Sequence, residues 1–337
     1  MDNQINAEVD TRFSREVKKI RAEYMERRDK TNLGNYLDME HECGQKQKAA
    51  VVYWLDNGTG QGQTVRLFDI PGTLSGDILR LRANLPQRSD HYEIDGDEIH
   101  PLDAGLPLPE PDEDDSEDTD DLLASLPLVE VDRERHFVKK GKYRSEIVNL
   151  LKCQYGSCPG PPTTSKHIVQ LLGKSAKGEL VFDKFFPRQT VLTRFSDLAT
   201  FKRWLLHLVD ALESLHSANI VHRDLRVENF VFSRDGERLV VADLEEHWGQ
   251  RGAPEIAKDG PPVRAGWTTM SDVYQIAQCI RCMVLGDVPR TSQYPVPIPK
   301  PLDAIADACS RTVPELRPTV PQLRRMLEAI DPVADAE

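Results

Sequence analysis

The residues of this chain best suited to chemistry are an aspartate and an asparagine five positions apart. Asp224 and Asn229 lie in the stretch 221–229, which follows a segment of helical periodicity and precedes the apolar run 230–232. A carboxylate can accept the proton of an attacking hydroxyl, and an amide oxygen on the same loop can hold a magnesium ion on phosphate groups. Arg226 adds a cation between them. The spacing therefore indicates phosphoryl transfer.

The motifs around this stretch occur in a recognisable order. Residues 221–229 contain all five defined letters of H-R-D-L-x-x-x-N, and Asp243-Leu-Glu, Ala-Pro-Glu255, Ser-Asp272 and Pro-Glu-Leu-Arg317-Pro follow. Each motif alone is weak, but together they resemble the eukaryotic protein kinase superfamily over roughly residues 123–332. The compact front part and the poorly matched glycine loop are similar to the divergent kinase-like proteins of fungi.

This resemblance implies an α+β, two-lobed fold with a small β-rich upper lobe, a larger helical lower lobe and an N-terminal extension. It implies ATP and Mg²⁺ as cofactors and a protein hydroxyl of Ser/Thr type as acceptor, which the cation at Arg226 favours. The family's roles fall on Asp224, Arg226 and Asn229 for catalysis, on Lys139, Glu146 and Asp243 for the nucleotide, and on Asn229 with Asp243 for the metal.

The elements that must position these residues are read from periodicity. Leucines at helical spacing predict a helix over 200–217, directly before the catalytic stretch. A helix is predicted over 143–153, and the runs 230–232 and 239–242 predict a hairpin that ends at Asp243. Further strands are predicted over 126–131, paired with 136–140, and over 168–172 and 180–185, with residues 182–186 as the hinge. Lys139 is preferred to Lys140 because it alternates in step with Phe137.

The family pattern also implies contacts that are structural rather than catalytic. Asp272 would brace the backbone of the catalytic stretch, and Glu255 with Arg317 would form a buried ion pair. The arginine of H-R-D, Arg223, normally binds a phosphate on the activation segment. Here the short segment 244–252 contains no Ser, Thr or Tyr, so Glu245 or Glu246 would supply the anion permanently.

Three departures from the family keep a second interpretation open. No convincing glycine loop precedes Lys139, the glycine of D-F-G is replaced by Glu245, and only nine residues separate Asp243 from Ala253. A carboxylate at position 245 would repel a triphosphate. The alternative is a pseudokinase that serves as a nucleotide-binding or scaffolding module.

Residues 1–100 are predicted to be an extension of unknown role. Phe13, Val17, Ile20 and Tyr24 recur at helical spacing behind a cap at Asp10 or Thr11. The runs 50–55 and 64–69 predict a hairpin, and residues 73–85 a short helix. The hairpin's loop holds Gly58 and Gly60, which also fit a displaced phosphate loop, although its third glycine position is occupied by Gln63.

Residues 101–122 are predicted to be an acidic, disordered linker. Nine acidic residues lie between Glu110 and Asp121 without a Lys or Arg, and the net charge of −12 becomes −3 without these nine. Ser116 and Thr119 within it are either targets of acidophilic kinases or parts of a solvated spacer. The remaining balance of charge gives no sign of nucleic-acid binding.

The composition, 39% hydrophobic and 29% charged, is typical of a soluble globular protein. We see no signal peptide or membrane-spanning run, which predicts a cytoplasmic or nuclear protein without membrane association. Cys279 and Cys282 have C-x-x-C spacing, but their apolar helical surroundings favour buried cysteines over a zinc site. The sequence leaves the protein partner or substrate and the oligomeric state open.

Overall fold

The computed structural model describes residues 11–29, 36–43, 49–55, 63–68, 90–95, 98–107, 114–156, 165–258, 264–286 and 296–332. The chain divides into two compact units. The larger unit comprises Met1–Lys18, Asp114–Asp287 and Pro297–Glu337, and the smaller comprises Lys19–Glu113 and Val288–Val296. All candidate site residues belong to the larger unit.

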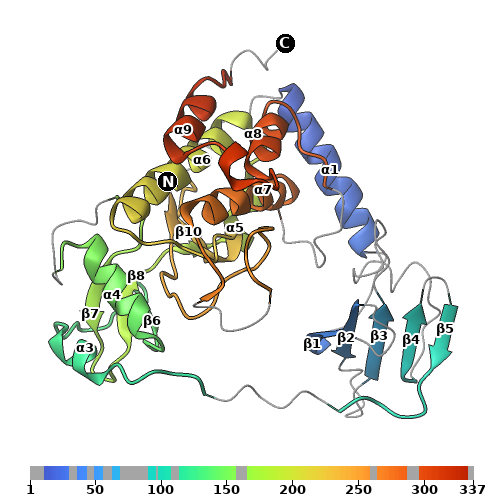
Figure 1. Cartoon of the computed structure of the whole chain (residues 1–337), viewed down its shortest axis with the longest axis horizontal. Helices are drawn as coiled ribbons and strands as arrows, with labels where there is room; N and C mark the ends of the chain where they lie inside the picture. The colour runs from blue at the N-terminus through green and yellow to red at the C-terminus, as the bar shows by residue number, and fades with distance from the viewer. Residues whose placement is uncertain are drawn as a thin grey trace. The chain divides into compact units, whose positions relative to one another are not determined.

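The smaller unit is built on one sheet whose strands follow the order β1-β2-β3-β4-β5 (Figure 1). These strands are Tyr36–Cys43, Ala49–Leu55, Gln63–Phe68, Tyr92–Asp95 and Glu98–Pro101. Strands β3 and β4 are parallel, whereas the other neighbours are antiparallel. The hairpin predicted from 50–55 and 64–69 is confirmed, with Leu55 opposite Gln63. Its glycine loop and the helix predicted over 73–85 lie outside the described residues.

Helix α1, Arg12–Asp29, confirms the predicted apolar stripe, because Phe13, Val17, Ile20 and Tyr24 are all buried. Thr11 is the cap, since its Oγ1 accepts from the main-chain nitrogen of Ser14 at 3.1 Å. The Phe13 ring meets Phe201 edge-on at 5.6 Å. The start of α1 therefore belongs to the larger unit. The role of the extension predicted over 1–100 stays open.

The larger unit contains a small sheet of order β6-β8-β7, formed by β6 (His136–Lys139), β7 (Leu171–Lys174) and β8 (Leu180–Asp183). Helix α4, Arg144–Cys153, follows β6 as predicted. The prediction that 126–131 pairs with 136–140 is wrong. Leu128 instead bridges Lys174 of β7, and β6 pairs with β8. Gly173 permits this approach, because a Cβ there would lie 2.3 Å from the main-chain oxygen of Pro127.

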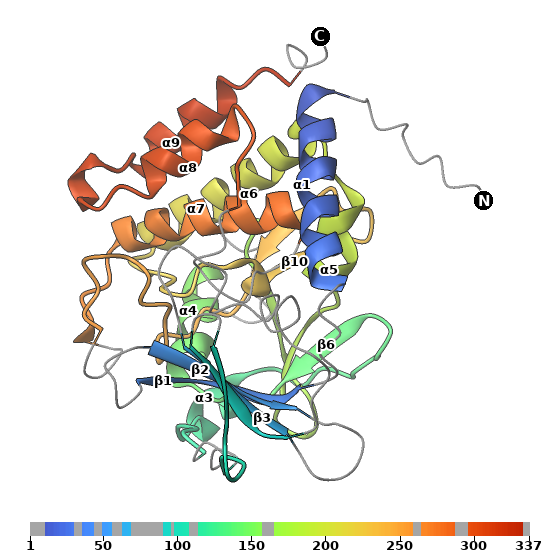
Figure 2. The same cartoon turned by 90° about the vertical axis from the view of Figure 1, so that its right-hand side faces the viewer.

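The rest of the larger unit is mainly helical (Figure 2). Its helices are α5 (Arg188–Val191), α6 (Leu198–Ser217), α7 (Thr269–Leu285), α8 (Leu302–Cys309) and α9 (Val320–Glu328). A small sheet of order β11-β10-β9 comprises Phe186–Pro187 (β9), Phe230–Phe232 (β10) and Leu239–Val241 (β11). The helix predicted over 200–217 is confirmed as α6, which Asp197 caps through the main-chain nitrogen of Thr200 at 2.7 Å. Its apolar face, including Trp204 and Leu208, is buried.

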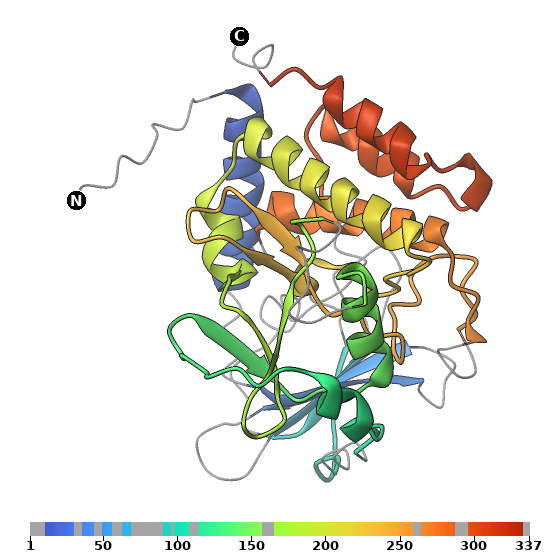
Figure 3. The ribbon, with the colours of Figure 1, turned by 90° about the vertical axis from the view of Figure 1, so that its left-hand side faces the viewer.

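Helices and small sheets together make this an α+β chain, as predicted. Strands β6–β8 gather with α4 in one part of the larger unit, and α6–α9 form another part (Figure 3). Their interpretation as two lobes around a nucleotide stays a prediction. Among the described residues, no helix combines the length and the apolar character needed to cross a bilayer.

The acidic stretch differs most from its prediction. Residues 114–122 have defined contacts in the larger unit, so a disordered linker over all of 101–122 is wrong for this part. Asp114 pairs with Lys140 at 3.2 Å and Asp115 with Lys142 at 2.9 Å, and Asp120–Ser125 form helix α3. Cations on the neighbouring segment offset the acidic charge, which composition alone does not reveal. Residues 108–113 lie outside the described residues.

Candidate active site

Asp224 and Asn229 are joined directly within the catalytic stretch. The Asn229 side-chain nitrogen donates to the main-chain oxygen of Asp224 at 2.8 Å and to its carboxylate Oδ2 at 2.9 Å. The Nε of Arg226 lies 3.1 Å from the same Oδ2. The bonds leave Oδ1 of Asp224 and the amide oxygen of Asn229 without a donor or cation among the described residues. These two oxygens are therefore available to a hydroxyl and to a cation.

Helix α7 holds the backbone of this stretch. Asp272, buried at the start of α7, accepts hydrogen bonds from the main-chain nitrogens of His222 and Arg223, both at 2.9 Å. This confirms the predicted brace. Gln275 adds two bonds that sequence reasoning missed, donating to the Arg223 oxygen at 2.6 Å and accepting from the Leu225 nitrogen at 2.7 Å. Its position one helical turn after Asp272 was the available signal.

Lys139 connects the two predicted nucleotide carboxylates. Its Nζ lies 2.8 Å from Glu146 Oε1 and 2.7 Å from Asp243 Oδ1. The Glu146 side chain is only 4% exposed. Lys140, the alternative one residue away, is 64% exposed and pairs with Asp114 instead. The structure thus brings Lys139, Glu146 and Asp243 together, as the predicted pairing of Lys139 with Glu146 requires.

The electrostatics of this cluster follow from burial and mutual charge. Burial alone would lower the pKa of Lys139, but the carboxylates of Glu146 and Asp243 raise it overall, so the ammonium stays charged. Burial raises the pKa of Glu146 against the opposing charge of Lys139. The charge of the lysine is therefore the main influence that opposes the effect of burial on the Glu146 pKa.

The β10–β11 hairpin connects the catalytic stretch, which ends at Asn229, with Asp243 of the Lys139 cluster. Phe230 pairs with Val241, so Asn229 and Asp243 lie at the same end of the hairpin. The Ala242 nitrogen donates to the Asn229 main-chain oxygen at 2.9 Å. Asp243 has a φ of 64°, a left-handed conformation that is uncommon outside glycine and marks a constrained position.

The oxygens left at this end of the hairpin suit a magnesium ion. Mg²⁺ is bound by a few protein oxygens together with phosphate oxygens and water. The amide oxygen of Asn229 and the second carboxylate oxygen of Asp243 are the candidates. No group of three His, Cys, Asp or Glu side chains able to hold a metal occurs in the described part of the chain. This donor set fits a cation that is held jointly with a nucleotide.

The short segment after Asp243 is fixed through Glu246. The Glu246 carboxylate lies 2.8 Å from the guanidinium of Arg223 and accepts from the Asn149 side chain at 2.9 Å. The Glu246 nitrogen donates to Ser145 Oγ at 2.9 Å. Of the two acidic residues predicted to serve Arg223, Glu246 makes the contact. Glu245 instead accepts from the main-chain nitrogens of His247 and Trp248.

Arg317 and Glu255 form the predicted buried ion pair. Two guanidinium nitrogens lie 2.6 and 2.7 Å from the two carboxylate oxygens, and the Arg317 side chain is 0% exposed. Arg317 also donates to the main-chain oxygens of Arg311 and Met270. Burial opposes ionisation of Glu255, but Arg317 lowers its pKa overall.

The cysteines of the C-x-x-C spacing are both buried in α7, as predicted. Cys279 donates to the Leu225 main-chain oxygen at 3.4 Å, and burial raises the pKa of its thiol well above the ordinary value. The thiol therefore serves as a packing contact beneath the catalytic stretch.

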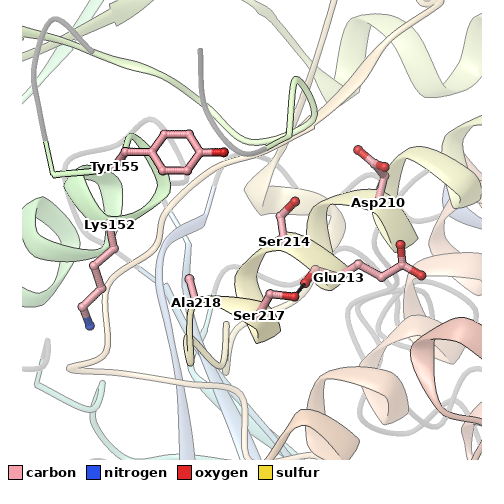
Figure 4. A pocket seen from close by; sticks show the side chains of 7 residues that line it. All are labelled: Lys152, Tyr155, Asp210, Glu213, Ser214, Ser217 and Ala218. Carbon is pink, nitrogen blue, oxygen red and sulfur yellow. Dashed lines mark hydrogen bonds between the residues drawn. The ribbon is translucent and has the colours of Figure 1, made fainter. Parts of the chain in front are cut away.

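A pocket of about 410 Å³ lies elsewhere, where the end of α4 faces α6 (Figure 4). It is lined by Lys152, Tyr155, Asp210, Glu213, Ser214, Ser217 and Ala218. None of the six candidate residues lines it, and two of its carboxylates are engaged by Arg324 at 3.5 and 2.7 Å. This pocket is separate from the candidate site.

Comparison with known proteins finds no matching family model. Segments of the chain are similar to curated protein kinases. Serine/threonine-protein kinase PKH3 of Saccharomyces cerevisiae is 42% identical over 65 residues, which is 18% of this chain and 7% of that protein. Hormonally up-regulated neu tumor-associated kinase of Mus musculus is 30% identical over 106 residues, 28% and 15% of the two chains. A probable casein kinase I homolog of Encephalitozoon cuniculi is 38% identical over 76 residues, 23% and 22%.

The chain thus spans less than a quarter of the length of each of these relatives. The similarity supports a relationship to protein kinases over these segments.

Proposed function

We propose that the chain is a protein kinase-like enzyme that transfers the γ-phosphoryl group of ATP, with Mg²⁺, to a hydroxyl of a protein, of Ser/Thr type. The observation that carries this proposal is the pair of contacts from Lys139 Nζ, 2.8 Å to Glu146 and 2.7 Å to Asp243. A buried carboxylate costs free energy unless it is paired. Here one ammonium group, that of Lys139, is shared by two carboxylates. Such a site can exchange the contact between Lys139 and Asp243 for contacts with phosphate and metal.

Each of the six candidate residues has a defined role in this proposal. Lys139 holds phosphate oxygens while Glu146 keeps its ammonium in place. Asp243 and the amide oxygen of Asn229 hold magnesium, which neutralises charge on the phosphates when bound. Asp224 orients the acceptor hydroxyl through Oδ1, because its Oδ2 is occupied by Asn229 and Arg226. Arg226 offsets negative charge beside the transferred group.

The rival proposal is a pseudokinase that binds nucleotide or a protein partner without turnover. Glu245 in place of the family's glycine and the short segment 244–252 favour it. Glu245 lies near enough to Asp243 for the latter's charge to help raise the Glu245 pKa, after the larger contribution of burial. A negative charge on Glu245 would repel a triphosphate. Its carboxylate, however, accepts hydrogen bonds from the main-chain nitrogens of His247 and Trp248.

The decisive experiment measures binding and turnover separately on the full chain. We expect Mg-ATP to raise the melting temperature and radiolabelled ATP to give phosphate transfer to the chain itself or to a mixture of protein substrates. Asp224→Asn should abolish transfer and retain binding, whereas Asp243→Ala should lose both. Binding without transfer in the wild-type chain would establish the rival, and the absence of any nucleotide binding would leave only a scaffolding role.

We further propose a cytoplasmic or nuclear site of action and a protein partner or substrate, with no role for nucleic acid or membrane. The charge distribution supports the absence of nucleic-acid binding, because the balance outside the acidic tract is only −3. Fractionation of cells that express the tagged chain tests the location directly.

A further inference from the structure

The acidic segment 114–121 runs beside the segment 140–144 that leads into α4. The two are joined through the main chain, since the Glu117 nitrogen donates to the Lys142 oxygen at 2.8 Å. Every cation of the second segment faces an acid of the first. The pairs are Asp114 with Lys140 at 3.2 Å, Asp115 with Lys142 at 2.9 Å and Asp121 with Arg144 at 2.8 Å. The charges are matched in order along both segments.

The same acidic segment completes the N-terminus of α4. The residue at the cap position, Tyr143, provides no side-chain cap. Glu117 supplies the acceptor instead, because its Oε2 accepts from the Arg144 nitrogen at 2.7 Å. Buried Thr119 donates to the Gly141 oxygen at 3.1 Å. A carboxylate at a helix N-terminus satisfies an otherwise unpaired N–H and is favoured by the helix dipole. This helix carries Glu146 in its first turn.

Asp115 extends these contacts to the segment that follows Asp243. Its Oδ2 accepts from Tyr143 Oη at 2.7 Å and from Trp248 Nε1 at 3.1 Å. Trp248 Nε1 also lies 2.8 Å from Tyr143 Oη, and the His247 ring stacks on Tyr143 at 4.5 Å and 9°. Trp248 is 51% exposed, so these polar contacts, rather than burial, orient its indole.

We infer that residues 114–121, the acidic strap, position both α4 and the 245–248 turn, with Asp115 as the positioning residue that joins them. The strap acts beside the direct bonds of Glu246 to Ser145 and Asn149 of α4. The segment 244–252 carries no Ser, Thr or Tyr hydroxyl for phosphorylation. The strap thus adds a second fixed set of contacts to the one that Glu246 makes with Arg223. Its effect on nucleotide binding rests on the proposed function, whereas its effect on α4 does not.

Charge and geometry predict how the strap responds to salt. Asp114, Lys140, Lys142 and Arg144 are substantially exposed, so their pairs are individually weak and are screened by added salt. The Glu117 cap and the contacts of Asp115 with Tyr143 and Trp248 depend on direct hydrogen bonds and resist screening better. Salt should therefore loosen the strap without releasing it.

Hydrogen–deuterium exchange on the full chain tests the strap without nucleotide. In Asp115→Asn we expect amides of the first turn of α4 and of residues 246–249 to exchange about tenfold faster, the factor for loss of one charge-assisted hydrogen bond. Exchange in α6 and α9 should not change. Asp115→Glu, which keeps the carboxylate, should restore most of the protection. Asp120→Asn is the matched control, because the Asp120 carboxylate makes no hydrogen bond or ion pair with any described side chain.

Two results would overturn the inference. One is unchanged exchange in Asp115→Asn at both sites, and the other is equally faster exchange throughout α6 and α9, which would mean general destabilisation. A second measurement, the affinity for Mg-ATP, should fall in Asp115→Asn and not in Asp120→Asn. If the wild-type chain binds no nucleotide, the proposed function fails, but the exchange result still decides whether the strap positions α4.

Discussion

Arg223 and Glu246 form an ion pair of 2.8 Å that joins the catalytic stretch to the segment after Asp243. A second guanidinium nitrogen of Arg223 donates to the Glu246 main-chain oxygen at 2.8 Å. Because Asn149 and Ser145 of α4 bind the same residue, Glu246 connects three elements of the site. The Arg223 Nε is buried without a partner among the described residues, so the arginine depends strongly on this one carboxylate.

The first prediction concerns the charge of Glu246. Glu246→Gln keeps the size of the side chain but leaves the mostly buried Arg223 without a countercharge. We expect the free energy of unfolding in urea to fall by about 1–3 kcal/mol, and the affinity for Mg-ATP to fall with it. Glu237→Gln, which removes the charge from a more exposed pair with Arg203, should change neither by much. Unchanged melting temperature and unchanged nucleotide affinity in Glu246→Gln would refute a fixed anion at this position.

A second prediction separates Lys139 from its neighbour. In Lys139→Met, Glu146 and Asp243 lose their shared cation, so nucleotide affinity should fall at least about tenfold, the equivalent of 1.4 kcal/mol. Lys140→Met changes an exposed residue that pairs with Asp114 and should bind nucleotide as the wild type does. Isothermal titration with Mg-ATP distinguishes the two. Equal losses in both variants would mean that the lysine position is wrongly assigned.

Lys139→Met should also change how stability depends on pH. Burial already raises the pKa of Glu146, and loss of the lysine removes the main charge that opposes this rise. A carboxylate with a raised pKa takes up its proton more readily in the folded state, so the folded state gains stability as the pH falls. The deficit of the variant relative to wild type should therefore be largest near neutral pH and shrink toward acidic pH. A constant deficit would contradict an influence of Lys139 on the Glu146 pKa.

The residues of the candidate site stand out in the sequence because they lie at fixed spacings within short motifs. Asp224 and Asn229 share one loop, and the contacts of Asp272 and of Arg317 with Glu255 follow from the order of the motifs. Helix α6 was predictable for a different reason, since its buried leucines recur with the helical period. In each case, local spacing or a recurrent motif carries the information.

The acidic segment and the small sheet were not predictable in this way. One partner of Asp115 is Trp248, which is 133 positions away in the chain. Composition therefore favoured a disordered spacer where the fold supplies matching cations. The pairing of β6 with β8, rather than with 126–131, depends on which edges meet in space. Strand propensity carries no such information. Gln275 lacked a motif letter and was missed for that reason.

A third prediction concerns the buried ion pair of Glu255 and Arg317. Removing one partner leaves the other charged and unpaired in the interior, which costs about 3–5 kcal/mol. Arg317→Leu should therefore lower the urea midpoint strongly. Arg311→Leu changes an exposed arginine of the same region and should have little effect. A loss below about 1 kcal/mol in Arg317→Leu, the range of surface pairs, would contradict a structural role for the pair.

The last prediction concerns a stacked pair of histidines, His167 beside β11 and His207 in α6. The rings of His167 and His207 lie 3.9 Å apart at 16°, and the His167 Nδ1 and His207 Nδ1 contact the main-chain oxygen and nitrogen of Leu239. Burial, followed by the repulsion that a protonated His167 would exert, lowers the pKa of His207 to about 3. Burial also lowers the pKa of His167. The folded state therefore keeps both rings neutral.

The sign of the effect follows from the proton count. Below the ordinary histidine pKa of about 6.5 the unfolded chain binds protons that the folded chain does not, so stability is fully present above that value. It should fall as the pH decreases from about 6.5 toward 3, with a slope of up to about 1.4 kcal/mol per pH unit for each proton. Urea unfolding over this range measures the slope. His207→Gln should reduce it, whereas His100→Gln, at an exposed histidine, should not. An identical slope in wild type and His207→Gln would show that this ring does not limit stability in acid.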